Sequence, residues 1–338
     1  MSNPYKSTVP VMMVFFNRPE PLKQVFEAVR RARPQKLFLV QDGARENRPG
    51  DAENILKCRE VVSQVDWECE VHTNYSEENL GCGMRIYSGI SWCFEQVDRL
   101  MILEDDCVPA QDFFPFCEEV LERYQDDQRV NQICGMNHLG EYDKADNSYF
   151  FSHMGSCWGW ATWKRVWDQM EYNMEFMQDQ EAMRNISRMP YPPGEGKTLV
   201  QTAQERYRIL KSGGKLTAWT MQFGFARYLQ SQLLIIPRKN LIQNVGLTQD
   251  SAHAVNSIRK IPKHLQPVFF GKHHSVQFPL KHPKYMIADT DYADAVIKIM
   301  KGNLLQKAEG LARRVVFSDK GEIAAMVKKI PKKLSGKR

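Results

Sequence analysis

The 338-residue sequence lacks any run of about 18 consecutive apolar residues, so we expect no membrane-spanning helix. Its first residues show neither a charged segment followed by a long apolar stretch nor a small-residue cleavage site, and we therefore expect a cytoplasmic protein. The eight cysteines form no CxxC pair and no zinc-type spacing, which argues against a zinc finger and for free thiols. Hydrophobic residues make up 43% and charged residues 25%, which excludes a disordered or fibrous chain.

The net charge of +6 is unevenly distributed along the chain. Residues 301–338 contain eleven Lys and Arg against three acids, a net charge of +8, so the preceding 300 residues carry −2. A nucleic-acid-binding core needs a basic face on the folded body, and this body is slightly acidic. We therefore expect no nucleic-acid partner.

The first hundred residues alternate between strand and helix patterns. Strands are expected at residues 9–16, 36–40, 67–73 and 99–103, and helices at 19–31, 52–65 and 84–96. This order predicts an α/β fold with a Rossmann-like, mainly parallel sheet flanked by helices. Ligands of such sheets bind beyond the carboxyl ends of the strands. Polar residues follow three of these ends: Asn17, Arg18, Gln41, Asp42, Glu104, Asp105 and Asp106.

The later part of the chain is less regular. Helices are expected at residues 112–124, 202–211 and 221–231, and strands at 130–135 and 233–236. From about residue 255 the pattern becomes irregular and then basic and amphipathic. Apolar residues recur at helical spacing from Leu304 to Val316, which suits an interfacial helix on an anionic membrane. A solvated tail helix or a contact with another protein is the alternative.

The most informative motif is LMILEDDCVP at residues 100–109. An apolar strand leads directly into Glu104, Asp105 and Asp106, and three adjacent carboxylates repel one another unless a cation compensates them. Hard oxygen ligands suit Mg²⁺ or Mn²⁺, which bridge the phosphate oxygens of a nucleotide. The alternative is a solvated turn after a strand.

Two further motifs could bind a nucleotide. In QDG, the carboxylate of Asp42 could accept the N–H of uracil, although strand–Asp–Gly turns are common. In NLGCGMRIY, two glycines precede a helix whose first amides could face a diphosphate, with Arg85 one turn inside. A flexible loop is the alternative for this second motif.

An aromatic segment and a late loop complete the candidates. Trp158, Gly159 and Trp160 offer flat surfaces for stacking sugar rings, whereas Trp163 and Trp167 are spaced as a core-facing pair on one helix. The loop after residue 236 carries Asn244 and His253, and His253 could close over phosphates or a metal. A lone loop histidine is more commonly a surface residue.

Together these motifs resemble a known family. The ordered set VPVMMVFFNRPEPLKQVFEAV, LFLVQDG, NLGCGMRIYSGISWCFEQ, LMILEDDCVPAQDFFPFCEEVLERY, GSCWGWATWKRVW and IPRKNLIQNVG is similar to bacterial family-2-like glycosyltransferases of the GT-A fold, the haemolysin-activation-like group. It resembles N-acetylglucosaminyltransferase I more distantly. The resemblance covers about residues 9–253 and implies a GT-A domain at 1–254, with a nucleotide-binding half to about 110 and an acceptor-binding half from 111. Residues 255–338 form a separate, basic C-terminal region.

The resemblance implies roles for individual residues. Asp42 would face the uracil of a UDP-sugar, with Asn17, Arg18 and Gln41 lining the nucleotide pocket and Arg85 near the diphosphate. Glu104 and Asp105 would contact ribose and sugar, and Asp106 would hold Mn²⁺ or Mg²⁺ together with His253. Residues Trp158–Trp160 would floor the sugar site, and Asn244 would lie on the closing loop.

One position departs from the family pattern. Thr220 stands where relatives carry an Asp suited to act as the catalytic base, and a threonine hydroxyl does not serve as a base at its ordinary pKa. Glu141, Asp168 and Glu205 are the possible substitutes.

The implied activity is inverting transfer from a UDP-sugar to a hydroxyl of a growing bacterial surface glycan. The basic C-terminal helix, which lies outside the resemblance, leads us to expect a lipid-linked acceptor of the O-antigen or capsule type and peripheral contact with the inner face of the cytoplasmic membrane. The alternatives are a catalytically silent UDP-sugar-binding partner and a sugar nucleotidyltransferase. The latter lacks support because the first loop, FFNRPEPL, is poor in glycine and basic residues.

Overall fold

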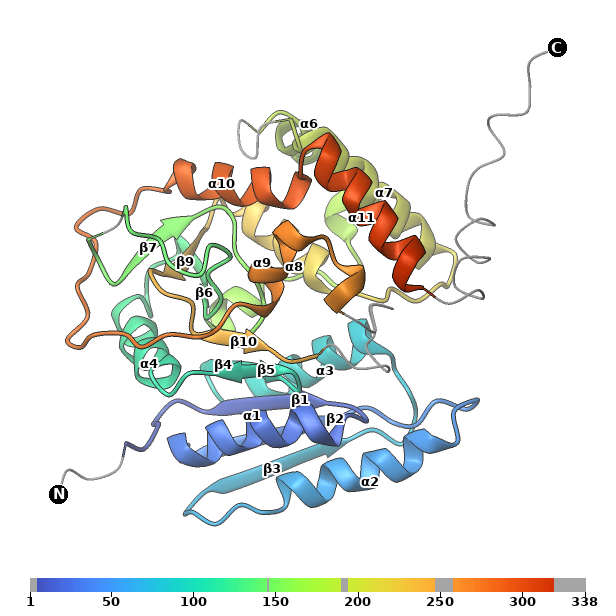
Figure 1. Ribbon diagram of the computed structural model, residues 1–338, viewed down its shortest axis with the longest axis vertical. Coiled ribbons are helices and arrows are strands. Elements are labelled where there is room, and N and C mark those ends of the chain that lie inside the picture. Colours follow the sequence, from blue (N-terminus) through green and yellow to red (C-terminus); the bar gives the residue numbers. More distant parts are fainter. Residues whose placement is uncertain (1–4, 145, 190–193, 247–257, 319–338) are drawn as a thin grey trace.

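A computed structural model of the chain describes residues 5–144, 146–189, 194–246 and 258–318. At its centre lies an eight-stranded mixed sheet with strand order β3-β2-β1-β4-β8-β6-β9-β7 (Figure 1). A second, two-stranded sheet pairs β5 (Cys107–Pro109) with β10 (Ile242–Asn244). The expected α/β class, with a large mostly parallel sheet flanked by helices, is confirmed.

The first four strands in the sequence form the parallel half of the sheet. They are β1 (Val11–Phe15), β2 (Lys36–Gln41), β3 (Glu70–Tyr75) and β4 (Arg99–Glu104). Each connection contains a helix: α1 (Pro19–Ala32), α2 (Gly50–Val62) or α3 (Cys82–Phe94). Helix α1 packs against α2, whereas α3 packs against β1, β2 and β4. Because helices cover both faces, β1 and β4 are apolar almost throughout.

The second half of the sheet is mixed. Strand β8 (Trp160–Trp163) runs antiparallel between β4 and β6 (Val130–Cys134), β6 is parallel to β9 (Leu233–Pro237), and β7 (Tyr149–Ser152) is antiparallel at the edge. The helices of this half are α4 (Phe113–Arg123), α5 (Lys164–Trp167), α6 (Gln180–Ser187), α7 (Gly196–Lys211) and α8 (Thr220–Leu229). One main apolar core extends along both halves of the sheet.

The C-terminal part contains more regular structure than the sequence indicates. Helices α9 (Gln266–Phe270), α10 (Thr290–Lys301) and α11 (Leu304–Phe317) follow two short 3₁₀ turns, η2 (Ile258–Lys260) and η3 (Lys263–Leu265). Tyr292 and Val296 of α10 are buried against residues of β7 and β9, so α10 belongs to the packed body. Within the described ranges, no helix is long and apolar enough to cross a membrane.

The sequence reading missed strands β5, β7, β8 and β10 and helices α6, α9 and α10. The expectation that Trp163 and Trp167 share one helical face is wrong, because Trp163 ends β8 and only Trp167 belongs to a helix. Both side chains are nevertheless buried, at 3% and 4% exposure. The i, i+4 spacing therefore predicted correctly that both tryptophans are buried, but it assigned Trp163 to a helix although it lies in a strand.

Candidate functional site

The candidate site lies where the parallel strands β1, β2 and β4 end. Val14 pairs with Glu104 and Phe15 pairs with Gln41, so the residues that follow these strands meet at one edge of the sheet. This is the edge at which open α/β sheets bind ligands. The residue pairs fix Arg18, Asp42 and the acidic triplet Glu104–Asp106 on the same side of the molecule.

The centre of this edge is an ion-pair cluster that joins Arg18 to the acidic triplet. The Arg18 guanidinium donates to both carboxylate oxygens of Asp105, with Nε 3.3 Å from Oδ2, and its Nη2 lies 3.1 Å from Asp106 Oδ2. Asp105 is 5% exposed, and the Asp106 and Arg18 side chains are each 16% exposed. A cation of the protein itself therefore partly offsets the repulsion among the acids.

Burial and mutual repulsion change the proton affinities of this cluster. Burial, followed by the charges of Asp106 and Asp105, raises the pKa of Glu104. Burial also raises the pKa of Asp105, because it outweighs the lowering effect of Arg18. Burial alone would lower the pKa of Arg18, but Asp105 and Asp106 raise it above its ordinary range. Removing a negative charge or adding a further cation would thus reduce the electrostatic repulsion among these carboxylates.

The β5–β10 pairing brings the late loop to this cluster. Asn244 pairs with Cys107, directly after Asp106, and its side-chain oxygen accepts from the Gly246 N–H at 2.9 Å. The Val245 N–H donates to the Asp106 carbonyl at 2.9 Å, and Arg18 Nη1 reaches the Gly246 carbonyl at 3.5 Å. A Cβ on Gly246 would lie 2.0 Å from Asp106 Oδ2, so only glycine permits this close approach. His253 lies outside the described residues.

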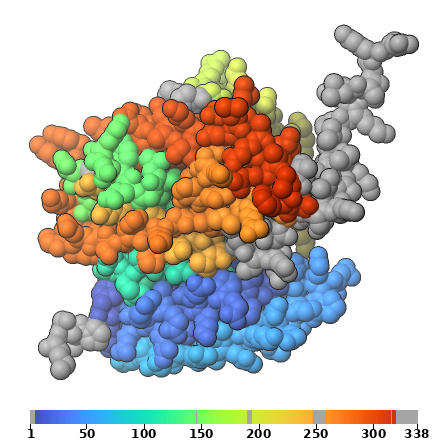
Figure 2. Space-filling model, in the orientation of Figure 1, coloured from blue at the N-terminus to red at the C-terminus, as the bar shows by residue number. Residues whose placement is uncertain are grey.

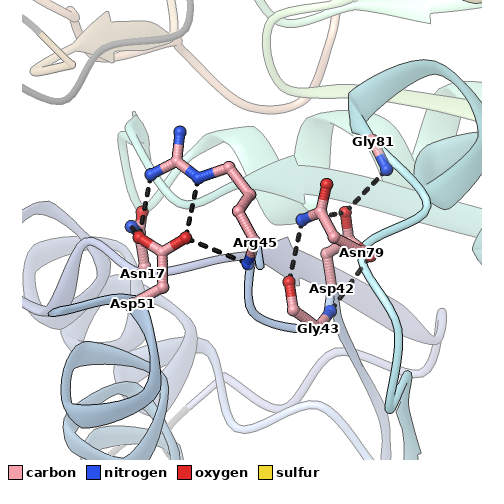
Figure 3. Close-up of polar contacts among 7 residues, drawn as sticks. All are labelled: Asn17, Asp42, Gly43, Arg45, Asp51, Asn79 and Gly81. Atoms are coloured by element: carbon pink, nitrogen blue, oxygen red, sulfur yellow. Dashed lines mark hydrogen bonds and ion pairs between the residues drawn. The ribbon is translucent and has the colours of Figure 1, made fainter. Parts of the chain in front are cut away.

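Asp42 has a structural role that its motif did not reveal (Figure 3). Its Oδ1 accepts from the backbone N–H groups of Gly43 and Leu80 at 3.0 and 2.9 Å. Its Oδ2 accepts from Gly81 N and Asn79 Nδ2 at 3.0 and 3.1 Å. A carboxylate offers about four acceptor positions. All four are taken, so the expectation that Asp42 accepts the uracil N–H is not met in this arrangement.

A second polar network, also drawn in Figure 3, surrounds Asp51. Asn17 Nδ2 donates to Asp51 Oδ1 at 2.7 Å, and the Arg45 guanidinium donates to both carboxylate oxygens at 2.7 and 2.8 Å. These hydrogen bonds from Arg45, with that from Asn17, lower the pKa of Asp51. The Arg45 guanidinium also lies 5.2 Å from the centre of the Phe16 ring. Asn17 thus supports the loop after β2 from the end of β1.

Gln41 and Arg85 are structural residues rather than pocket-lining ones. The Gln41 side chain is fully buried and donates to the carbonyls of Phe16 and Ile55. Arg85 is 4% exposed, and it donates to the Gln41 carbonyl and to Asn74. The expected contacts of Gln41 with the nucleotide and of Arg85 with the diphosphate are therefore corrected: both side chains tie strand ends together inside the fold.

The aromatic segment divides between core and surface. Trp160 is 1% exposed and lies against Trp219 and Phe223, with ring centres 5.5 and 5.1 Å apart, so its expected contact with sugar is wrong. Trp158 is half-buried, and the centre of its ring lies 5.6 Å from the centre of the Phe269 ring. Gly159 has φ +56°, and a Cβ there would lie 2.2 Å from Ile242 Cδ1. Its expected sugar contact is thus replaced by a packing role under β10.

The structure assigns no catalytic base among the substitutes. Asp168 pairs with Lys164 in an i, i+4 ion pair directly after α5, and Trp163 of the adjoining strand pairs with Arg99 at the start of β4. Asp168 therefore lies near the amino end of β4, whereas Glu104 lies at the carboxyl end of the same strand. This placement contradicts the role of catalytic base expected for Asp168. Glu141 pairs with Lys239 at 3.2 Å. Glu205 lies on α7, and Thr220 is exposed at the start of α8.

A cavity of about 700 Å³ also lies at the opposite edge, lined by Pro10, Asp98, Arg99, Trp163, Lys164 and Asp168 among others. It contains none of the triplet residues. This cavity is therefore separate from the polar cluster at the carboxyl ends of the strands.

The carboxylates of this cluster suit only a metal ion that takes few protein ligands. Among the described residues, no three His, Cys, Asp or Glu side chains are arranged to hold a metal. Arg18 contacts both carboxylate oxygens of Asp105 and one oxygen of Asp106. Mg²⁺ commonly takes one or two carboxylates and completes its shell with water and substrate phosphates. Asp106 fits that arrangement, whereas a closed protein metal site does not.

Sequence reasoning missed Arg45, Asp51 and Asn79, which hold the loops around the site. Asp51 lies in the first turn of α2, and only its position relative to Asn17, 34 residues earlier, identifies its role.

The scan against protein-family models found no matching family, and the search of curated proteins found no match.

Proposed function

We propose that the protein is a glycosyltransferase with a GT-A fold, which transfers a sugar from a UDP-sugar to a hydroxyl of a growing bacterial surface glycan. The observation that supports the proposal best is the acidic triplet at the carboxyl end of β4, paired with Arg18 and covered by Asn244–Gly246. A strand-end carboxylate cluster of this kind suits a metal bound to a nucleotide diphosphate.

In this proposal Mn²⁺ or Mg²⁺, when bound with the donor, would supply charge stabilisation for the departing diphosphate. Asp106 would hold it, because its Oδ1 is not engaged by Arg18. Arg18 would hold Asp105 in place beside it. Glu104 remains the candidate for ribose and sugar contacts, since its side chain is half-buried at the strand end.

Asp42 and Asn17 act in the proposal as positioning residues. Asp42 fixes residues 79–81 immediately before α3, and Asn17 fixes Asp51 and through it Arg45. The side chain of Arg45 is 44% exposed, so it retains surface that can face an anionic ligand.

Thr220 is the observation that favours a second candidate function, a UDP-sugar-binding partner without transfer activity. Inverting transfer needs a base that deprotonates the acceptor hydroxyl. The exposed Thr220 does not supply one, and Asp168 lies at the wrong edge of the sheet. Both candidate functions share the donor site and differ only in turnover.

The deciding experiment is a thermal-shift screen of UDP-sugars with and without Mn²⁺, on the wild type, Asp106→Ala and Asp168→Ala. We expect a metal-dependent shift in the wild type that Asp106→Ala abolishes. Asp168→Ala serves as the matched control and should retain the shift, because Asp168 lies at the far edge. Absence of a shift with every UDP ligand would defeat the proposal.

A turnover assay then separates the two candidate functions. Release of UDP from a bound donor in the presence of lipid-linked acceptor extracts supports the transferase. Metal-dependent UDP binding with no turnover in any extract supports the silent partner. We place the reaction at the inner face of the cytoplasmic membrane, where a lipid-linked acceptor is exposed to soluble donors.

A further inference from the structure

Helix α11 (Leu304–Phe317) presents an apolar face to solvent. Four of its large apolar side chains are highly exposed: Leu304 at 84%, Leu305 at 81%, Val316 at 71% and Leu311 at 65%. Ala308 and Ala312 are exposed as well. At 3.6 residues per turn these six positions fall on one broad stripe. An ordinary surface helix buries such a stripe.

The opposite, more polar face packs on the protein. Gly310 is buried, and a Cβ there would lie 2.8 Å from Pro262 Cγ, so α11 approaches the segment before η3 closely. Arg313 pairs with Glu309 and its Nη1 donates to the Arg259 carbonyl at 3.0 Å. The helix is therefore docked by glycine and charged groups, with its apolar residues pointing outward.

Other features show that this helix is a defined element. Asn303 forms a capping box with Gln306, in which each side chain bonds the other residue's backbone N–H. Figures 1 and 2 show α11 on the outside of the molecule, on the side away from α1 and α2. Its outward stripe is thus presented on a capped helix that is anchored to the body.

The charges around the stripe indicate what covers it. Lys307 and Arg314 are seven residues apart, exposed, and lie along one border of the stripe. The next twenty residues, 319–338, contain seven Lys and Arg and two acids, a net charge of +5. A second copy of the chain would bring two such basic segments together, whereas a negatively charged surface would be attracted.

We propose that α11 is an interfacial helix that docks this protein on an anionic lipid bilayer. The stripe Leu304, Leu305, Leu311 and Val316 would enter the boundary between head groups and acyl chains, and Lys307 and Arg314 would contact lipid phosphates. This inference stands on α11 alone and does not depend on the donor site. Vesicle binding and UDP binding can therefore fail separately.

The test is co-sedimentation of the full chain with vesicles of phosphatidylcholine containing about one third phosphatidylglycerol, compared with phosphatidylcholine alone. The wild type should bind the anionic vesicles, and rising salt should weaken that binding. The triple variant Leu304→Ser, Leu305→Ser, Leu311→Ser should bind at least about 30-fold more weakly, because each loses buried hydrocarbon. The double variant Lys307→Glu, Arg314→Glu should lose at least about 25-fold.

The matched control changes three exposed apolar residues elsewhere: Leu56→Ser, Val71→Ser and Ile209→Ser. This control should bind like the wild type. Because all of the substituted side chains are exposed, circular dichroism of every variant should match that of the wild type.

Three results would overturn the inference. One is wild-type protein that fails to bind anionic vesicles, or that binds neutral ones equally. Another is a triple serine variant that binds as well as the wild type. The third is a wild-type dimer that the triple variant converts to monomer with vesicle binding unchanged, since the stripe would then be a protein interface.

Discussion

Replacing Arg18 by methionine should expose the energetic role of the ion-pair cluster. Methionine keeps the length of the side chain and removes the charge that faces Asp105 and Asp106. Two unit charges about 4 Å apart at an effective dielectric constant near 20 attract by about 4 kcal/mol, and desolvation offsets part of this. Removal of one partner of a buried pair typically costs about 3–5 kcal/mol. Because the Arg18 side chain is 16% exposed, we expect a loss of about 3 kcal/mol at pH 8.

The loss should depend on pH in a defined direction. Without Arg18, the pKa of Asp105 in the folded state rises further above its unfolded value near 4, since burial already raises it. A carboxyl group whose pKa is raised by folding costs stability as pH increases through the window between the unfolded and folded values. The deficit of the Arg18→Met variant should therefore be smallest near pH 5 and grow toward pH 8.

Urea unfolding at both pH values, followed by circular dichroism, measures this deficit. The same substitution in an Asp105→Asn background should cost about 2 kcal/mol less, because the uncompensated charge is absent. A deficit that stays constant between pH 5 and pH 8, or effects of the two substitutions that simply add, would refute the reasoning. Either outcome would mean that Arg18 and Asp105 are not energetically coupled.

Three further outcomes are expected. Asp51→Asn should lower the free energy of unfolding by about 2 kcal/mol at pH 7, because Asp51 accepts charged hydrogen bonds from Arg45. Since folding lowers the pKa of Asp51, this difference, measured by urea unfolding, should begin to shrink below the unfolded value near 4 and be lost as the pH falls through the lower folded value. Gly159→Ala should cost about 2–3 kcal/mol in the same assay, because alanine is strained at φ +56° and its Cβ meets Ile242; a neutral effect would contradict that packing. Gly246→Ala should weaken Mn²⁺-dependent UDP binding at least about fivefold in calorimetry, because its Cβ collides with Asp106 Oδ2; unchanged binding would separate this loop from the site.

The elements of the parallel half-sheet are the part of the fold that local sequence patterns indicate well. Strands with apolar runs and helices with a 3.6-residue period bury predictable faces, so β1, β2 and β4 lie within two residues of their expected bounds. The same logic places the acidic triplet at a strand end. Strands β7 and β8 escaped detection because aromatic clusters suit a strand and a helix equally well over four residues.

The roles of individual polar residues depended on partners far away in the chain. Asp42 looks available in its motif, but residues 79–81 fill three of its four acceptor positions and the Gly43 N–H fills the fourth. Arg18 and Asp105 form an ion pair although they are 87 residues apart in the sequence. Hydrogen-bond saturation and charge compensation are decided by which residues the fold brings within about 3 Å, and no local pattern encodes that.

The sequence alone determined the α/β class, the strand-end position of Glu104–Asp106 and the basic character of the C-terminal region, because composition and periodicity are local properties. Only the tertiary structure decided that Trp160 belongs to the core and that the apolar stripe of α11 faces outward. Periodicity shows that a helix has an apolar face, but burial of that face depends on what the rest of the chain packs against it.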